Sequence, residues 1–165
     1  GDFGTVLHGS PDALTAFAPS VRTGDAPSAW AAMDTGTDRQ LWGLWTDPAT
    51  GTAHSCGEEG TVLVLDRGQW EALPPPGDLG LHALERAPDG ALLAAGQLGE
   101  IHRFDGSRWE AKPMSGKPRP GNLAVDRRGV VWAGARTSSG SVIGLGVLRF
   151  DGMSWSCVTA HCPQA

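Results

Sequence analysis

The chain has 165 residues, which suits one domain with a sizeable core or a short run of structural repeats. Its 24 glycines and 12 prolines, with only 19% charged residues, favour many turns and argue against long solvent-exposed helices. A net charge of -5 argues against a nucleic-acid partner, and no apolar run approaches the roughly 18 residues of a membrane span.

Residues 1–33 have the pattern of the second half of a repeat unit. A strand is expected over residues 3–8, followed by a long Ala-, Ser- and Pro-rich loop over residues 9–27 and a short strand around Trp30. The sequence begins with neither an initiator methionine nor a signal-peptide pattern. We therefore expect a processed chain or a fragment.

From residue 34 the chain repeats a unit of about forty residues. Short apolar segments alternate with turns that contain glycine, as in a four-stranded antiparallel meander. The landmarks Gly51, Gly57, Gly60, Asp66 and Trp70 recur 39 residues later as Gly90, Gly96, Gly99, Asp105 and Trp109. A strict period of this kind indicates a repeat architecture.

The third copy of the unit contains an insertion. Gly129 keeps the 39-residue register from Gly90, but Trp155 follows Trp109 by 46 residues. The additional residues fall in a Ser- and Gly-rich segment, residues 135–145, which we expect to be a long loop between the second and third strands. The resulting divisions are residues 1–33, 34–74, 75–113 and 114–159, with a tail at 160–165.

A unit of this length with four strands is typical of a β-propeller blade. The alternatives, a β-sandwich or a β-helix, fit the constant register less well. The chain supplies about three and a half blades, whereas closed propellers usually contain roughly 4 to 8. We therefore expect it to be part of a larger propeller or to associate with the missing blades.

Two motifs resemble those of a known family. G-Q-L-G at residues 96–99 is followed by R-F-D-G-S-R-W at residues 103–109, and R-F-D-G-M-S-W recurs at residues 149–155. The pattern is similar to bacterial extracellular β-propeller repeats with a G-x-x-G turn and an R-[FY]-D-G-x-x-W segment, loosely related to sialidase, photosystem II assembly-factor and WD40-like propellers. The resemblance implies an all-β propeller in an extracellular, periplasmic or outer-membrane-associated protein.

The recurring aspartates Asp66, Asp105 and Asp151 are interpreted as structural. Each lies in a hairpin turn, where aspartate suits the local backbone. A glycosidase needs two converging carboxylates, whereas identical positions on different blades point apart. The chain also has no tyrosine to act as a sialidase nucleophile. We predict no enzymatic activity and no catalytic residues, with a glycoside hydrolase fragment as the least favoured alternative.

The histidines and cysteines do not form a metal-binding pattern. No pair among the 5 histidines has the spacing and the clustered carboxylates of a metal centre, so no metal or cofactor is predicted. Cys157 and Cys162 can form a disulfide in an oxidising compartment. The alternative is that these two and Cys56 are unrelated thiols.

Six of the tryptophans fall into two groups. Four recur near the start of an outer strand, where large rings are expected to pack between neighbouring blades: Trp30, Trp70, Trp109 and Trp155. Trp42 and Trp45 lie on an innermost strand and do not recur in the other units. We expect core packing for them, with the alternative that one lines the central channel or stacks on a sugar. His82, on the next innermost strand, is a further candidate for the channel.

The candidate binding surface is the face on which the loops vary most between copies. In a four-stranded blade, the connections to the next blade and the turns between the second and third strands emerge on this face. The residues nominated there are Glu58, Glu59, Asp78, Gln97, Arg119 and Arg136. Our main hypothesis is a non-catalytic, exported scaffold that binds protein partners, and the alternative is a lectin-like propeller that binds carbohydrate.

Overall fold

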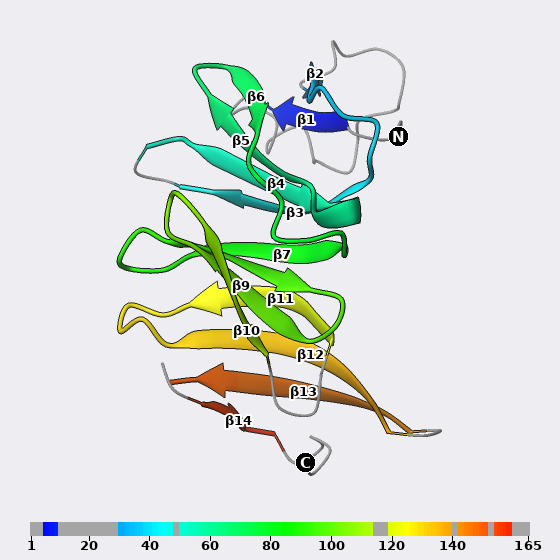
Figure 1. Ribbon diagram of the computed structural model, residues 1–165, viewed down its shortest axis with the longest axis vertical. Coiled ribbons are helices and arrows are strands. Elements are labelled where there is room, and N and C mark those ends of the chain that lie inside the picture. Colours follow the sequence, from blue (N-terminus) through cyan, green and yellow to red (C-terminus); the bar gives the residue numbers. More distant parts are fainter. Residues whose placement is uncertain are drawn as a thin grey trace, which may run out of the picture.

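The computed structural model describes residues 5–9, 30–47, 50–113, 119–139, 142–151 and 154–159. The described strands form three four-stranded antiparallel sheets and one two-stranded sheet (Figure 1). In each four-stranded sheet, strands that are consecutive in the sequence are neighbours in the sheet. The predicted loop over residues 9–27 and the predicted tail at 160–165 fall almost entirely outside the described residues.

We name the three larger sheets blades 1, 2 and 3. Blade 1 contains β3 (Leu41–Thr46), β4 (Ala53–Gly57), β5 (Val62–Asp66) and β6 (Gln69–Ala72), with a short 3₁₀ turn, η2 (Glu58–Gly60), between β4 and β5. Blade 2 contains β7 (Leu81–Arg86), β8 (Leu92–Gly96), β9 (Glu100–Phe104) and β10 (Trp109–Pro113). Blade 3 contains β11 (Arg119–Val125), β12 (Val131–Ser139), β13 (Val142–Phe150) and β14 (Trp155–Cys157). The two-stranded sheet pairs β1 (Thr5–Gly9) with β2 (Trp30–Asp34).

The blades follow one another along the molecule from the N-terminal to the C-terminal end (Figure 1). Their innermost strands are adjacent, with β3 beside β7 and β7 beside β11. Successive meanders that meet through their first strands and pack face to face are the arrangement of neighbouring propeller blades. The predicted all-β architecture of four-stranded blades is therefore confirmed.

The core lies between the blades. One apolar cluster joins blades 1 and 2 and contains Cys56, Val62, Leu81, Leu84, Leu92, Ala94 and Phe104. A second cluster joins blades 2 and 3 and contains Ala83, Leu93, Ala95, Ile101, Val131, Ala133 and Leu148. Because successive strand residues point to opposite faces of a sheet, β8 sends Leu92 and Ala94 to one cluster and Leu93 and Ala95 to the other. Its sequence is therefore continuously apolar, and it is buried along its whole length.

Each innermost strand has a β-bulge near its first residue. The pairing shifts between Leu41 and Gly43 in β3, between Leu81 and Ala83 in β7, and between Pro120 and Asn122 in β11. The unpaired bulge residues are therefore Trp42, His82 and Gly121. A bulge re-aims its side chain relative to the regular strand, so these three positions form a set of their own.

The expected loop over residues 135–145 is wrong. β12 and β13 continue their antiparallel ladder as far as the pair Ser139 and Val142, so the insertion lengthens a hairpin. Figure 1 shows this hairpin extending beyond the other strands. Pairing satisfies the backbone N–H and C=O groups of the insertion, which an unpaired segment of the same Ser and Gly content would leave to water.

A substitution at Gly43 tests how closely blades 1 and 2 pack. A Cβ at this position would lie 2.6 Å from Cys56 Sγ and 3.0 Å from the carbonyl oxygen of His82. We therefore expect Gly43→Ala to lower the free energy of unfolding by about 1 to 3 kcal/mol. Gly77→Ala is the matched control, because nothing lies within 4 Å of a Cβ there. Thermal unfolding followed by circular dichroism measures both, and equal midpoints for wild type and Gly43→Ala would contradict this packing.

Candidate binding surfaces

The loop-rich face is the end of the blades at which the innermost strands begin. Backbone hydrogen bonds attach the turns between second and third strands to this end: Glu58 N donates to Gln40 O at 2.9 Å, and Gln97 N donates to Gly80 O at 3.1 Å. The turns between first and second strands lie at the opposite end. The structure therefore places the nominated turn residues beside the first residues of β3 and β7.

Two bulge residues form an aromatic stack on the loop-rich face. The rings of Trp42 and His82 have centroids 4.9 Å apart and an interplanar angle of 17°. Trp42 keeps 39% of its surface exposed. The equivalent bulge residue of blade 3 is Gly121, so the stack has no third ring. It presents an open aromatic surface beside the innermost strands.

Polar side chains surround this stack. Trp42 Nε1 donates to Gln40 Oε1 at 3.2 Å. A Cβ on Gly80 would lie 2.5 Å from Trp42 Cζ3 and 2.9 Å from Gln97 Nε2, so the indole lies against the backbone of Gly80 with the Gln97 amide next to it. We call Gln40, Trp42, Gly80, His82 and Gln97 the axial cluster. It combines a flat apolar surface with neutral hydrogen-bonding groups.

The axial cluster is uncharged at neutral pH. Desolvation lowers the pKa of His82 below its ordinary value, and the positive charge of Arg119 lowers it further. Both effects disfavour the imidazolium, so the neutral ring is the stable form. A neutral imidazole offers one N–H donor and one nitrogen acceptor to a ligand.

Glu58 and Glu59 secure the start of β3. Glu58 Oε2 accepts a hydrogen bond from Gln40 N at 3.1 Å, and Glu59 forms an ion pair with Arg39. Glu59 also adopts a positive φ of 50° within η2. These contacts favour a structural role for both residues.

The remaining nominees are dispersed. Trp45 packs against the cluster between blades 1 and 2, with its ring tilted at 47° to that of His54. Asp78 is exposed on the segment that joins these blades. Arg136 pairs through its backbone with Arg119 in the extended part of β12, and its side chain lies outside the described residues. The structure thus brings Trp42, His82 and Gln97 together, places Arg119 within electrostatic reach of His82, and packs Trp45 against the interface between blades 1 and 2.

The turn aspartates hold their hairpins. Asp105 Oδ1 accepts hydrogen bonds from Arg108 N at 2.9 Å and from Ser107 N at 2.8 Å. Hydrogen bonding lowers the pKa of Asp105 to about 2, and the bond from Arg108 N makes the largest contribution, followed by those from Ser107. Asp151 Oδ1 accepts from Ser154 N at 2.9 Å in the same way. Asp66 is exposed beside Arg67, whose φ is 47°.

Two of the outer-strand tryptophans, Trp109 and Trp155, lie toward the preceding blade. Trp109 contacts Phe104 in the cluster between blades 1 and 2, and its Nε1 donates to Pro74 O at 2.6 Å. Trp155 stacks on Phe150 against the cluster between blades 2 and 3. Trp70 is half-buried, and its buried Nε1 has no hydrogen-bond partner among the described residues. Trp30 lies in β2, and its side chain is outside the described residues.

The cysteines differ in state. Cys56 is free and fully buried, and burial raises the pKa of its thiol to about 12, so it stays protonated. Cys157 is disulfide-bonded, and its expected partner Cys162 lies outside the described residues. Within the described ranges, no three His, Cys, Asp or Glu residues gather as metal ligands do. No helix in this part of the chain is long and apolar enough to cross a membrane.

Two equivalent grooves lie between the blades at the end opposite the loop-rich face. The groove between blades 1 and 2 has a volume of about 340 Å³, and the groove between blades 2 and 3 about 390 Å³. Six positions that line one groove have an equivalent in the internal repeat that lines the other, for example Gly90 and Gly129, or Phe104 and Phe150. Neither groove was predicted from the sequence, because the binding residues were expected in the variable loops. The signal that could have revealed the grooves is a difference in charge between equivalent strand positions, such as Val64 and Arg103.

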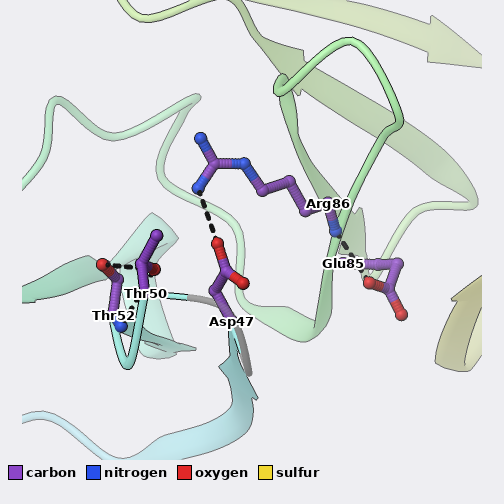
Figure 2. A network of polar contacts seen from close by, with 5 residues as sticks. All are labelled: Asp47, Thr50, Thr52, Glu85 and Arg86. Atoms are coloured by element: carbon purple, nitrogen blue, oxygen red, sulfur yellow. Dashed lines mark hydrogen bonds and ion pairs between the residues drawn. The ribbon is translucent and has the colours of Figure 1, made fainter.

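The groove between blades 1 and 2 is bordered by an ion pair that joins the blades. Figure 2 shows Arg86, at the end of β7, pointing toward Asp47 at the turn of blade 1, and Arg86 Nη1 lies 3.9 Å from Asp47 Oδ2. His54 lines this groove, and burial lowers its pKa, so it is neutral. No residue in the described part of the chain forms a hydrogen bond with its Nδ1.

Comparison with known proteins supports the architecture. No family model matches the chain, and no curated protein is significantly similar to it. A solved structure titled "YCF48 bound to D1 peptide" matches with a TM-score of 0.60 and 21% identity, over 78% of this chain and 42% of that one. The fold is that of a β-propeller. The chain spans less than half of the length of that propeller chain.

A second solved structure is a fucose lectin from Kordia zhangzhouensis in complex with methyl-fucoside. It matches with a TM-score of 0.46 and 14% identity, over 72% of this chain and 98% of that one.

The charge of Arg119 should affect the measured pKa of His82. Replacing Arg119 by glutamine removes a nearby positive charge, so we expect the pKa of His82 to rise toward its ordinary value. Arg127→Gln, an exposed change on the turn at the opposite end of blade 3, should leave it unchanged. NMR titration of the imidazole measures both. An unchanged or lower pKa in Arg119→Gln would place Arg119 away from the axial cluster.

Proposed function

We propose that this chain is a non-catalytic β-propeller module that serves as a platform for protein partners, and that further propeller blades cover the outer faces of blades 1 and 3. The observation that carries the proposal is the contrast between equivalent residues inside and at the ends of the row of blades. Positions that are buried between blades become exposed where no neighbouring blade is present.

Leu44 and Leu84 show this difference in exposure at the outer face of blade 1. They occupy the same position of β3 and β7, opposite Ser55 and Ala94 in their ladders. Leu84 is 5% exposed in the interface between blades 1 and 2, whereas Leu44 is 57% exposed. Within the described residues, the preceding sheet contains β1 and β2, which we propose as the third and fourth strands of a blade whose inner strands would cover Leu44.

Ile101 and Val147 make the same contrast at the other end. They occupy the same position of β9 and β13, opposite Ala95 and Gly134. Ile101 is 6% exposed between blades 2 and 3, whereas Val147 is 38% exposed on the outer face of blade 3. Leu44 and Val147 are thus exposed at positions whose equivalents are buried by a neighbouring blade, and burying one such side chain is worth about 1.5 to 3 kcal/mol.

The loop-rich face supports the platform part of the proposal. The axial cluster offers an exposed indole with amides beside it, and aromatic side chains are enriched where proteins bind one another. The similar propeller of known structure is bound to a peptide. The disulfide at Cys157 supports the accompanying proposal that the protein works in an oxidising compartment outside the cytoplasm.

Carbohydrate binding is a second candidate function. It is favoured by the exposed face of Trp42 with the Gln40 and Gln97 amides next to it, since an indole can stack on a sugar ring while amides bond its hydroxyls. A glycan array with wild type and Trp42→Ala separates the candidates. Saturable sugar binding that Trp42→Ala abolishes would favour the lectin, and no binding to any glycan would favour the protein platform.

The end faces predict self-association of the purified chain. Since each outer face exposes an apolar side chain that a neighbouring blade would bury, we expect light scattering to give a mass above 17.2 kDa that grows with concentration. The double variant Leu44→Asp/Val147→Asp should shift the mass toward that of the single chain. Leu98→Asp is the control, because Leu98 is equally exposed but lies on a turn of the loop-rich face. A wild-type chain that stays at 17.2 kDa at all concentrations and melts cooperatively would contradict the covered faces.

A further inference from the structure

We infer that the groove between blades 2 and 3 binds an acidic peptide segment that carries a large apolar side chain. This inference rests on the proposed function only in that the ligand is a protein segment. It concerns the end of the blades opposite the axial cluster, and it does not depend on the outer faces being covered.

The groove has an apolar wall and a basic rim. Its wall is formed by Leu93, Ile101, Val131, Phe150 and Trp155, and the last two rings stack with centroids 5.0 Å apart. Its rim carries three cations, Arg103, Lys112 and Arg128, and one carboxylate, Asp89. The cations come from β9, from β10 and from the turn between the first two strands of blade 3. The volume of about 390 Å³ lies within the range of ligand pockets.

The internal repeat shows that the fold does not need these cations. In the preceding repeat, the positions equivalent to Arg103, Lys112 and Arg128 hold Val64, Leu73 and Asp89, and the first two of these line the groove between blades 1 and 2. Both grooves form between blades of the same topology. The basic rim is therefore a property of one interface, and blade packing does not account for it.

Two of the three cations remain available to a ligand. Arg103 forms an ion pair with Asp89, which largely neutralises it. Lys112 Nζ lies 3.9 Å from Glu110 Oε1, a surface pair with both side chains about half exposed, which is worth little. Arg128 is exposed and makes no salt bridge with any residue that the structure describes, and its charge interacts with the nearby carboxylate of Asp126 across solvent. The groove therefore has local positive charge in a chain whose net charge is -5.

Charge and shape together select the occupant. An apolar side chain can enter between Leu93, Val131 and the Phe150 ring, and carboxylates next to it in a peptide can bind Lys112 and Arg128 through charge-assisted hydrogen bonds. A long polyanion such as a nucleic acid would meet the negative charge of the remaining chain. A short acidic segment avoids this repulsion, because its charge is confined to the groove.

The test uses a labelled hexapeptide with a central Phe-Leu pair flanked by two Asp residues on each side. Fluorescence anisotropy with the whole chain should show saturable binding that weakens as salt rises. The same peptide with Asn in place of Asp should have an affinity at least about tenfold lower. No saturable binding of the acidic peptide, or equal binding of both peptides, would overturn the inference.

A matched variant locates the site. Lys112→Leu/Arg128→Asp introduces the residues found at the equivalent positions of the preceding repeat, Leu73 and Asp89, so the variant is expected to fold. It should lose at least about tenfold in affinity, whereas the neighbouring exposed change Arg127→Gln should keep the wild-type affinity within about twofold. Equal affinities for wild type and the double variant would overturn the assignment.

A second readout does not depend on that variant. In the wild-type chain, the indole N–H signal of Trp155 in a ¹⁵N-correlated NMR spectrum should shift on addition of the acidic peptide, while the signal of Trp42 stays in place. A shift of the Trp42 signal alone would move peptide binding to the axial cluster, which would refute the groove and leave the proposed platform function intact.

Discussion

The packing of one blade against the next is the constraint on which the rest of the structure depends. A single four-stranded sheet of this chain has no core of its own, because the apolar residues of its strands point to two opposite faces. β8 shows this directly, since Leu92 and Ala94 are buried against blade 1 while Leu93 and Ala95 are buried against blade 3. Gly43 is small enough to let β7 approach β3 closely. The stability of each blade therefore comes from its neighbours, as in other repeat architectures.

The same constraint relates the fold to the proposed function. An interface that repeats along the chain must end somewhere, and at each end it leaves apolar positions exposed, as Leu44 and Val147 show. The two ends of each blade differ in character. The loop-rich face carries the neutral axial cluster of Trp42 and His82, and the opposite end carries grooves whose lining changes from one interface to the next. Residues needed for packing recur in every blade, whereas those available for binding do not.

The fold could be predicted from the sequence because its signals are local. Gly90, Gly99 and Gly129 have positive φ at their turns, and glycines at these positions mark the ends of strands. The hairpin over residues 135–145 could not be recognised in this way, because Ser and Gly occur in loops and in paired strands alike and only the partner strand decides. Which of Trp42 and Trp45 is exposed and which is packed between the blades also depends on a contact that the sequence alone does not determine. The bulge in β3 directs Trp42 to His82 of the next blade, while Trp45 points into the interface. The basic groove was detectable only by comparing Val64, Leu73 and Asp89 with their counterparts.

Side-chain solvent access in the native species tests the central claim most directly. Hydroxyl-radical footprinting with mass spectrometry compares the oxidation of Leu44 and Val147 with that of Leu84 and Ile101, their buried equivalents, and with that of Leu98, which is 54% exposed on a turn. If further blades cover the outer faces, Leu44 and Val147 will be protected to the same extent as Leu84 and Ile101. Oxidation of Leu44 and Val147 as fast as that of Leu98 would show that both faces are open to water, and would contradict the account.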